Sequence, residues 1–149
     1  MSAERRGFTI VELVIALLIG SILTSIALSS FGNVQGRLAV RGARNTFVSL
    51  QARARAQAIE TGDPVGVLVD VVGDSVTLVS QAGQTLENIH FDNEFNVDLK
   101  ATGNIIVCMN SRGYADTDCN NFASPVRLEF WQGADSASVV ILPLGQLVY

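Results

Sequence analysis

The sequence predicts an α+β fold, in which a long N-terminal helix packs on an antiparallel β-sheet head. Three observations support this. Residues 13–36 carry no charge, and residues 37–59 repeat apolar side chains every three or four positions, as an amphipathic helix does. From Val65 onward, short apolar runs alternate with turn residues, which is typical of strands. With 149 residues, the chain has room for one small domain and an anchor.

The uncharged stretch is long enough to cross a membrane as a helix. Its 24 residues span about 36 Å at about 1.5 Å per residue, and a bilayer core is about 30 Å thick. Arg5 and Arg6 precede it, so the positive-inside bias keeps the N-terminus in the cytoplasm and sends the rest across. An alternative is an ordinary secretory signal, for which Ala27-Leu28-Ser29 is a loose cleavage site.

Glu12 lies one turn into this apolar segment. A carboxylate within a membrane helix costs about 2.5–3.5 kcal/mol on insertion scales, and less near the interface. Because a buried carboxylate is tolerated when an ammonium can reach it, we expect Glu12 to have a charged partner. The alternative is that Glu12 extends to the headgroups and has no role. Ala16, Gly20 and Thr24 recur every four residues, a spacing that lets membrane helices pack closely and that also occurs in ordinary membrane helices.

The N-terminal residues carry a family resemblance. Arg5-Arg6-Gly7, followed by Phe8-Thr9-Ile10-Val11-Glu12-Leu13, resembles the class III signal of type IV pilins and type II secretion pseudopilins. The resemblance implies that prepilin peptidase cleaves between Gly7 and Phe8 and that Phe8 is then N-methylated. It also implies that Glu12 pairs with the terminal amine of a neighbouring subunit during assembly.

The same resemblance divides the chain into three parts. Residues 1–7 are a cleaved leader, residues 8–36 are a transmembrane helix anchor, and residues 37–149 are a periplasmic head that includes the second half of the helix. The protein is then expected in the bacterial inner membrane, and afterwards in a pilus or pseudopilus with other pilin-like subunits. Ser29 stands where major pilins usually carry a proline, which favours a minor subunit.

The second half of the helix has an apolar face and a basic face. The apolar stripe is formed by Val40, Ala43, Phe47, Leu50, Ala54 and Ala58. Four arginines, Arg37, Arg41, Arg44 and Arg55, fall on another face, which we expect to point outward. This face is a candidate contact for acidic subunits or for DNA phosphates; the alternative is a solvated surface. Thr61-Gly62-Asp63-Pro64 is a typical helix end.

Seven strands are predicted after the helix. Their ranges are 65–72, 75–80, 89–91, 104–109, 126–132, 138–142 and 146–149.

Three later segments resemble one subgroup of pilin-like proteins. Leu50 to Val65, Val107-Cys-Met-Asn-Ser-Arg-Gly113 and Val140-Ile-Leu-Pro-Leu-Gly145 resemble segments of the GspH/FimT-type minor subunits. This implies a minor pilin or pseudopilin near a filament tip, in type II secretion or in type IV pili that take up DNA. In DNA-binding members arginines follow the last motif, whereas here Gln146-Leu147-Val148 follows it.

The charge of the head also argues against the DNA-uptake alternative. From Glu60 onward there are twelve acidic residues and three basic ones, Lys100, Arg112 and Arg127. Nucleic-acid binders usually present a basic surface.

The two cysteines and a nearby acidic loop are the remaining candidate sites. Cys108 and Cys119 are expected to pair in an oxidising compartment; the alternative is two buried free thiols. Asp116, Asp118 and Asn120 alternate as ligands do at the start of a calcium loop. Asn121 and Arg127 then replace the expected glycine and glutamate, so a polar loop is favoured over an irregular calcium site.

The sequence predicts no enzyme and no cofactor. His90 is the single histidine, which leaves little for a catalytic triad or a zinc site, and we expect it on the surface or half-buried in a strand. Paired carboxylates such as Asp92 and Glu94 occur only in predicted loops. A membrane-tethered enzyme is therefore the weakest hypothesis.

Overall fold

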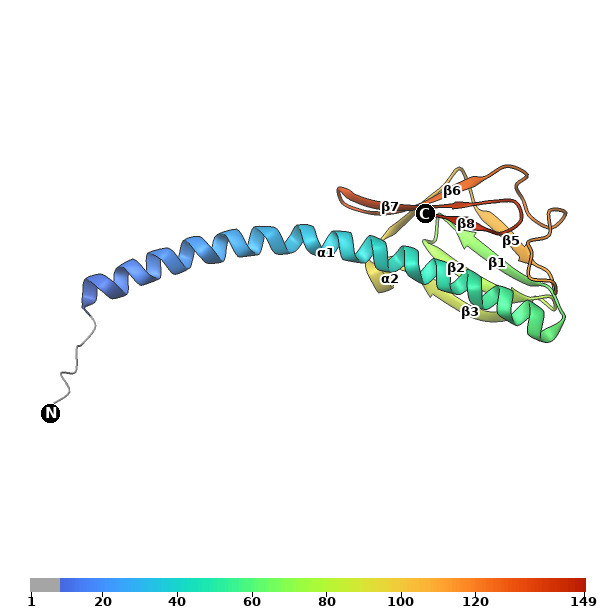
Figure 1. Cartoon of the computed structure of the whole chain (residues 1–149), viewed down its shortest axis with the longest axis horizontal. Coiled ribbons are helices and arrows are strands. Elements are labelled where there is room, and N and C mark those ends of the chain that lie inside the picture. The colour runs from blue at the N-terminus through green and yellow to red at the C-terminus, as the bar shows by residue number, and fades with distance from the viewer. Residues whose placement is uncertain (1–8) are drawn as a thin grey trace, which may run out of the picture. The chain divides into compact units, whose positions relative to one another are not determined.

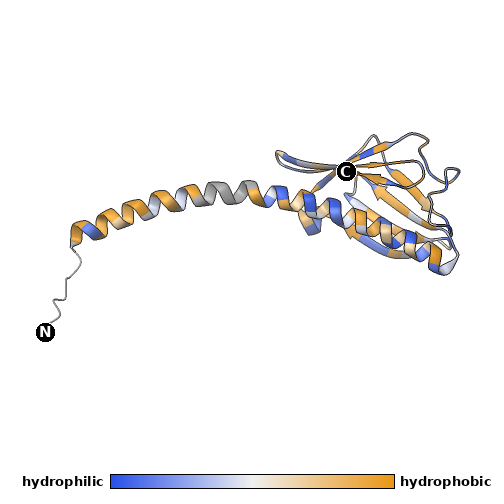
Figure 2. Ribbon diagram, in the orientation of Figure 1, coloured by the Kyte–Doolittle hydropathy of each residue, from blue (hydrophilic) through white to orange (hydrophobic). Residues whose placement is uncertain are grey.

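The computed structural model describes the backbone of residues 9–149 and the side chains of residues 9–26 and 34–149. The chain divides into two compact units, Met1–Gln35 and Gly36–Tyr149. The helix α1 runs from Ile10 to Thr61 and so belongs to both. In Figure 2 the first part of α1 is mostly hydrophobic, whereas hydrophobic and hydrophilic residues alternate along its last turns.

The second unit holds two antiparallel four-stranded sheets (Figure 1). The first sheet has the order β3-β2-β1-β5, and the second has the order β4-β6-β7-β8. The strands of the first sheet are β1 (Val65–Asp70), β2 (Ser75–Ser80), β3 (Thr85–His90) and β5 (Ile105–Met109). Those of the second are β4 (Asp98–Lys100), β6 (Val126–Gln132), β7 (Asp135–Ile141) and β8 (Leu147–Val148). The α+β class predicted from the sequence is confirmed, with two sheets in place of one.

The core of this unit lies between α1 and both sheets. The predicted stripe from Val40 to Ala58 is buried, and the inward residues of β1, β2, β5, β6 and β7 complete the same cluster. Aromatic side chains pack between the helix and the second sheet: the ring centroids of Phe47 in α1 and Phe130 in β6 lie 6.0 Å apart. Among the described side chains, every core residue falls between Val40 and Ile141, so residues 36–149 have a hydrophobic core of their own.

A short helix was not predicted. The helix α2 covers Phe91–Phe95, and Phe91 was assigned to a strand by the sequence pattern. Asn96 ends α2 in the left-handed conformation with φ 53°. The Asp74 carboxylate then accepts a hydrogen bond from the Leu99 N–H at 2.6 Å, which fixes the start of β4 beside the β1–β2 turn. A helix of five residues, such as α2, is too short for its sequence to show a helical period.

Candidate functional site

The N-terminal site is described from Thr9 onward; Gly7 and Phe8, the predicted processing residues, lie outside the described residues. Thr9 precedes α1, and its Oγ1 accepts a hydrogen bond from the Glu12 N–H at 3.2 Å. This is the contact that an N-cap residue makes with the third residue of a helix. Glu12 is therefore held in the first turn of α1, where it is exposed.

Apolar side chains surround Glu12 and are also exposed. Every described side chain from Thr9 to Ile26 is exposed, including eleven large apolar ones. The hydroxyls in this stretch bond to the helix itself: Ser21 Oγ donates to the Leu18 carbonyl at 2.8 Å, and Thr24 Oγ1 donates to the Gly20 carbonyl at 2.7 Å. Among the helices of the described residues, none combines the length and the hydropathy needed to span a membrane.

The four arginines of the predicted basic face do not all point outward. Arg37 and Arg41 are exposed, and Arg37 Nε lies 3.4 Å from the Asp135 carboxylate at the β6–β7 turn. Arg44 and Arg55 are half-buried, because the C-terminal segment lies against this side of α1. The Arg44 guanidinium stacks 5.1 Å from the centroid of the Tyr149 ring. The prediction of an outward face is therefore wrong for Arg44 and Arg55.

Arg55 is a structural residue between two glycine loops. Its Nη2 donates to the Gly145 carbonyl at 2.9 Å, and Gln51 Nε2 donates to the same oxygen at 2.8 Å. A side chain on Gly113 would approach Arg55 Cγ to 3.4 Å and Ile59 Cδ1 to 2.9 Å. The two glycine motifs singled out in the sequence therefore meet on the same turns of α1.

A disulfide joins Cys108 and Cys119, as the sequence predicts, with Cα atoms 5.8 Å apart. The neighbouring polar loop is held by Asn120, whose Oδ1 accepts from the Cys108 N–H at 2.9 Å and whose Nδ2 donates to the Pro143 carbonyl at 2.9 Å. The Asp116 carboxylate accepts from the Asp118 N–H at 3.0 Å. These contacts explain the loop as a structural connection between β5 and the β7–β8 turn. No group of three or more potential metal ligands occurs in the part of the chain that the structure describes.

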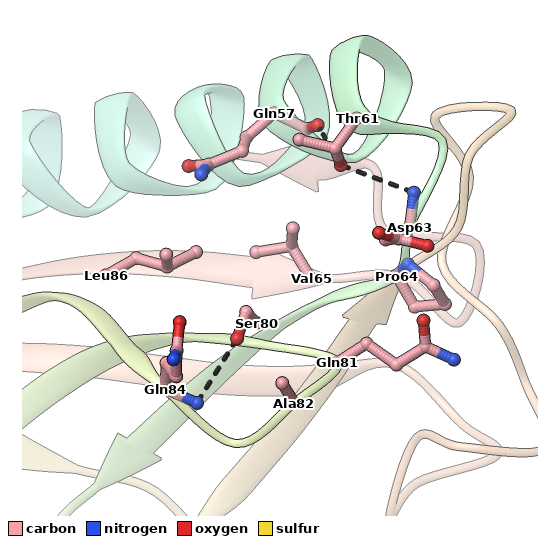
Figure 3. Close-up of a pocket in the computed structure, with 10 residues that line it drawn as sticks. All are labelled: Gln57, Thr61, Asp63, Pro64, Val65, Ser80, Gln81, Ala82, Gln84 and Leu86. Atoms are coloured by element: carbon pink, nitrogen blue, oxygen red, sulfur yellow. Dashed lines mark hydrogen bonds between the residues drawn. The ribbon is translucent and has the colours of Figure 1, made fainter.

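A cleft of about 420 Å³ lies at the end of α1, beside the β2–β3 turn (Figure 3). Gln57 and Thr61 of α1 face Val65 and Leu86 across it. Its polar groups are mostly uncharged amides and hydroxyls, and Asp63 is the single carboxylate in the lining. His90 lies outside this lining, exposed on β3, with its Nε2 3.3 Å from Asn88 Nδ2. The cleft therefore lacks the acid–base pair that hydrolytic chemistry needs.

The comparisons with known proteins address both parts of the chain. Residues 3–28 match the model of the prokaryotic N-terminal methylation motif. The minor pseudopilin EpsH from the type 2 secretion system of Vibrio cholerae has a similar structure, with 15% sequence identity and a TM-score of 0.54. That similarity covers 73% of this chain and 94% of EpsH.

The type IV minor pilin FimU from Pseudomonas aeruginosa is also similar, with 11% identity and a TM-score of 0.55 over 75% of this chain and 88% of FimU. The chain has a type IV pilin-like fold. No curated protein matches its sequence. In this pilin-like chain, the structural similarity covers 73% of the residues for EpsH and 75% for FimU, and the methylation motif carries the sequence similarity.

Sequence reasoning also missed contacts that Arg53 and Gln51 of α1 make. Arg53 Nη2 lies 2.9 Å from the Glu87 carboxylate on β3, and Gln51 is buried beneath Gly145. Both join residues far apart in the sequence, so no local pattern indicates them. A polar residue adjacent to the apolar stripe, such as Gln51 after Leu50, is the one local hint.

Proposed function

We propose that this chain is a minor pilin or pseudopilin, a structural subunit that joins a type IV pilus or a type II secretion pseudopilus near its tip. The observation that carries the proposal is the methylation motif at residues 3–28, followed by a head with a pilin-like fold. In this proposal residues 1–7 are a leader, residues 8–36 anchor the subunit in the inner membrane, and residues 37–149 form the periplasmic head.

Glu12 has the central role in assembly. Cleavage after Gly7 creates a free amine at Phe8, and the exposed Glu12 of α1 pairs with that amine on a neighbouring subunit. The exposed apolar side chains around Glu12 pack against the anchors of other subunits. A carboxylate in this setting is stabilised only when its partner is present, so pairing sets the register between subunits.

The N-terminal processing gives the first test. Intact mass and N-terminal sequencing of filament material are expected to give a mature chain that begins at Phe8 and carries one added methyl group. A mature start near Ser29 would contradict the class III signal and support an ordinary secretory signal.

Substitution of Glu12 gives the second test. Glu12→Ala is expected to leave the protein inserted and folded, since loss of a carboxylate eases insertion, but to exclude it from filaments. The control is Ser21→Ala, which removes a hydroxyl that bonds only within the helix. Wild-type incorporation of Glu12→Ala would show that Glu12 is merely tolerated.

Deletion of the gene tests whether the subunit belongs to a type II secretion system or to a type IV pilus. Secretion, twitching motility and transformation are scored side by side, with the gene returned in trans as the control. Loss of secretion alone assigns a pseudopilus, and loss of twitching or transformation assigns a type IV pilus.

A further inference from the structure

A second cleft, of about 340 Å³, runs along α1 beside the edge strand β8. Its size falls in the range of about 300–1,000 Å³ that is usual for ligand sites. One wall is the α1 face formed by Val48, Gln51, Ala52 and Arg55, and the other is the segment from Gly145 to Tyr149. No acidic side chain belongs to either wall. Arg55 is the one charged side chain in the lining, and Arg44 stacks on Tyr149, which also belongs to the lining.

The β8 side of the cleft offers a free backbone edge. The Leu142 N–H donates to the Gln146 carbonyl at 2.9 Å, and the next pairs along the hairpin are Ile141 with Leu147 and Val140 with Val148. In an antiparallel ladder, hydrogen-bonded and non-hydrogen-bonded pairs alternate. Leu147 is therefore in a non-hydrogen-bonded pair, and its N–H and C=O point away from β7.

The α1 side holds two polar atoms that have no hydrogen-bond partner. Gln51 is only 2% exposed, and its Oε1 is unpaired although its Nε2 bonds to Gly145. Arg55 Nε is likewise unpaired, although its Nη2 bonds to the same carbonyl. An unpaired buried polar group costs free energy. Both side chains line the cleft, so an occupant that reaches these two atoms would supply the partners that they lack.

We propose that this cleft binds an extended peptide segment with an acidic side chain, which adds a strand to β8 and places its carboxylate at Arg55. A peptide supplies N–H donors and C=O acceptors together, which match Leu147, Gln51 and Arg55. A phosphate chain supplies acceptors only and leaves the Leu147 carbonyl and Gln51 Oε1 unmatched. The inference rests on the proposed function only for the source of the segment, which is a neighbouring filament subunit.

The test is a titration of the ¹⁵N-labelled full chain in detergent micelles, followed by NMR. The probes are the capped tripeptide Val-Glu-Val, its Val-Gln-Val analogue, a Val-Glu-Val peptide methylated on the glutamate nitrogen, and a 12-base-pair DNA duplex. Val-Glu-Val is expected to cause saturable shifts at the Leu147 N–H and the Arg55 Nε–H. Loss of the charge is expected to weaken binding about tenfold, because charge-assisted hydrogen bonds are the stronger ones. Methylation, which removes a strand donor, is expected to abolish the Leu147 shift.

A matched pair of variants locates the site. Ala52 and Ala56 are both exposed on α1, and Ala52 alone lines the cleft. Ala52→Trp is expected to fill the cleft and weaken binding at least about tenfold, while Ala56→Trp leaves it unchanged. Absence of a saturable shift up to about 10 mM peptide would overturn the proposal, since tethering within a filament supplies effective concentrations of only about millimolar order. Shifts at the same atoms with DNA and not with peptide would also overturn it. Filament incorporation is scored separately, so failure of peptide binding and failure of the proposed function are distinguishable.

Discussion

Gly145 is the residue at which backbone conformation and packing most clearly act together. Its φ is 78°, and a side chain there would approach Ala115 Cβ to 2.9 Å. Gly83, in the β2–β3 turn, has nearly the same φ of 76° but no atom within 4 Å of the position of a side chain. The two glycines therefore separate the cost of the backbone conformation from the cost of the contact.

Alanine substitutions at these two positions are expected to differ in stability. Gly83→Ala is expected to lower the free energy of unfolding by about 1 kcal/mol, the cost of a left-handed alanine. Gly145→Ala is expected to lower it by about 3 kcal/mol, because overpacking adds to that cost. Urea denaturation of residues 36–149, followed by circular dichroism, measures both values. Equal losses for the two variants would show that the Gly145 turn moves away from Ala115 without strain.

Arg55 shows where residue-level prediction from the sequence stops. Its position on the face of Arg37, Arg41 and Arg44 follows from the helical period, and the structure agrees with that period. Its contact with Gly145 joins residues 90 positions apart in the sequence. A local pattern cannot indicate that the C-terminal segment covers one side of this face. Two of the four arginines predicted to point outward, Arg44 and Arg55, therefore make contacts within the head instead.

At the scale of elements, the disulfide closes a loop in the connection between β5 and β6. Cys108 and Cys119 are separated by 11 positions. Under the chain-entropy model, a link across a loop of this size contributes about 2–3 kcal/mol to the free energy of unfolding. Cys108→Ser with Cys119→Ser is expected to lose about that amount, measured by urea denaturation. The control is the wild-type head treated with reductant, which should match the double variant.

Peptide mapping checks the same link directly. Material purified from the periplasm and digested without reductant is expected to contain the Cys108 and Cys119 peptides joined. Free thiols in such material would contradict the pairing.

The predicted strands agree with the structure in part: β3 (Thr85–His90) was predicted only as 89–91, because most of its side chains are exposed, and β7 (Asp135–Ile141) was predicted to begin three residues late. The alternation in Ser75–Ser80 and Val126–Gln132 predicts β2 and β6 with their observed bounds. The helix α2 and the strand β4 have five and three residues, too few for a period of 3.6 or of 2 to appear. Their positions depend on the Asp74 contact with Leu99, which is a tertiary contact. For the same reason, the sequence does not show that the strands form two sheets.

At the scale of the whole molecule, the charge of the head distinguishes a structural subunit from a DNA-uptake subunit. Twelve acidic residues from Glu60 onward repel phosphates, against three basic ones. Of the four candidate arginines, Arg44 and Arg55 are half-buried and contact the C-terminal segment. The exposed Arg37 also lies against Asp135. The structure therefore leaves fewer cations on the surface than the sequence alone suggests.

Residues 36–149 are accordingly expected to bind duplex DNA weakly or not at all at physiological salt. Non-specific DNA binders reach dissociation constants of about 10⁻⁴–10⁻⁶ M there, and each phosphate contact adds about 0.9 to the slope of log K against log salt concentration. With Arg37 and Arg41 as the exposed pair, we expect a slope of about two at most and a dissociation constant weaker than about 10⁻⁴ M.

Fluorescence anisotropy with a labelled duplex, across a series of salt concentrations, measures both quantities. The matched variants are Arg37→Gln with Arg41→Gln, and Arg127→Gln as the control on β6. The contradicting outcome is micromolar binding with a steep slope that is lost in the helix variants and kept in the control. It would favour a DNA-uptake subunit over a purely structural one and identify the helix arginines as the DNA site.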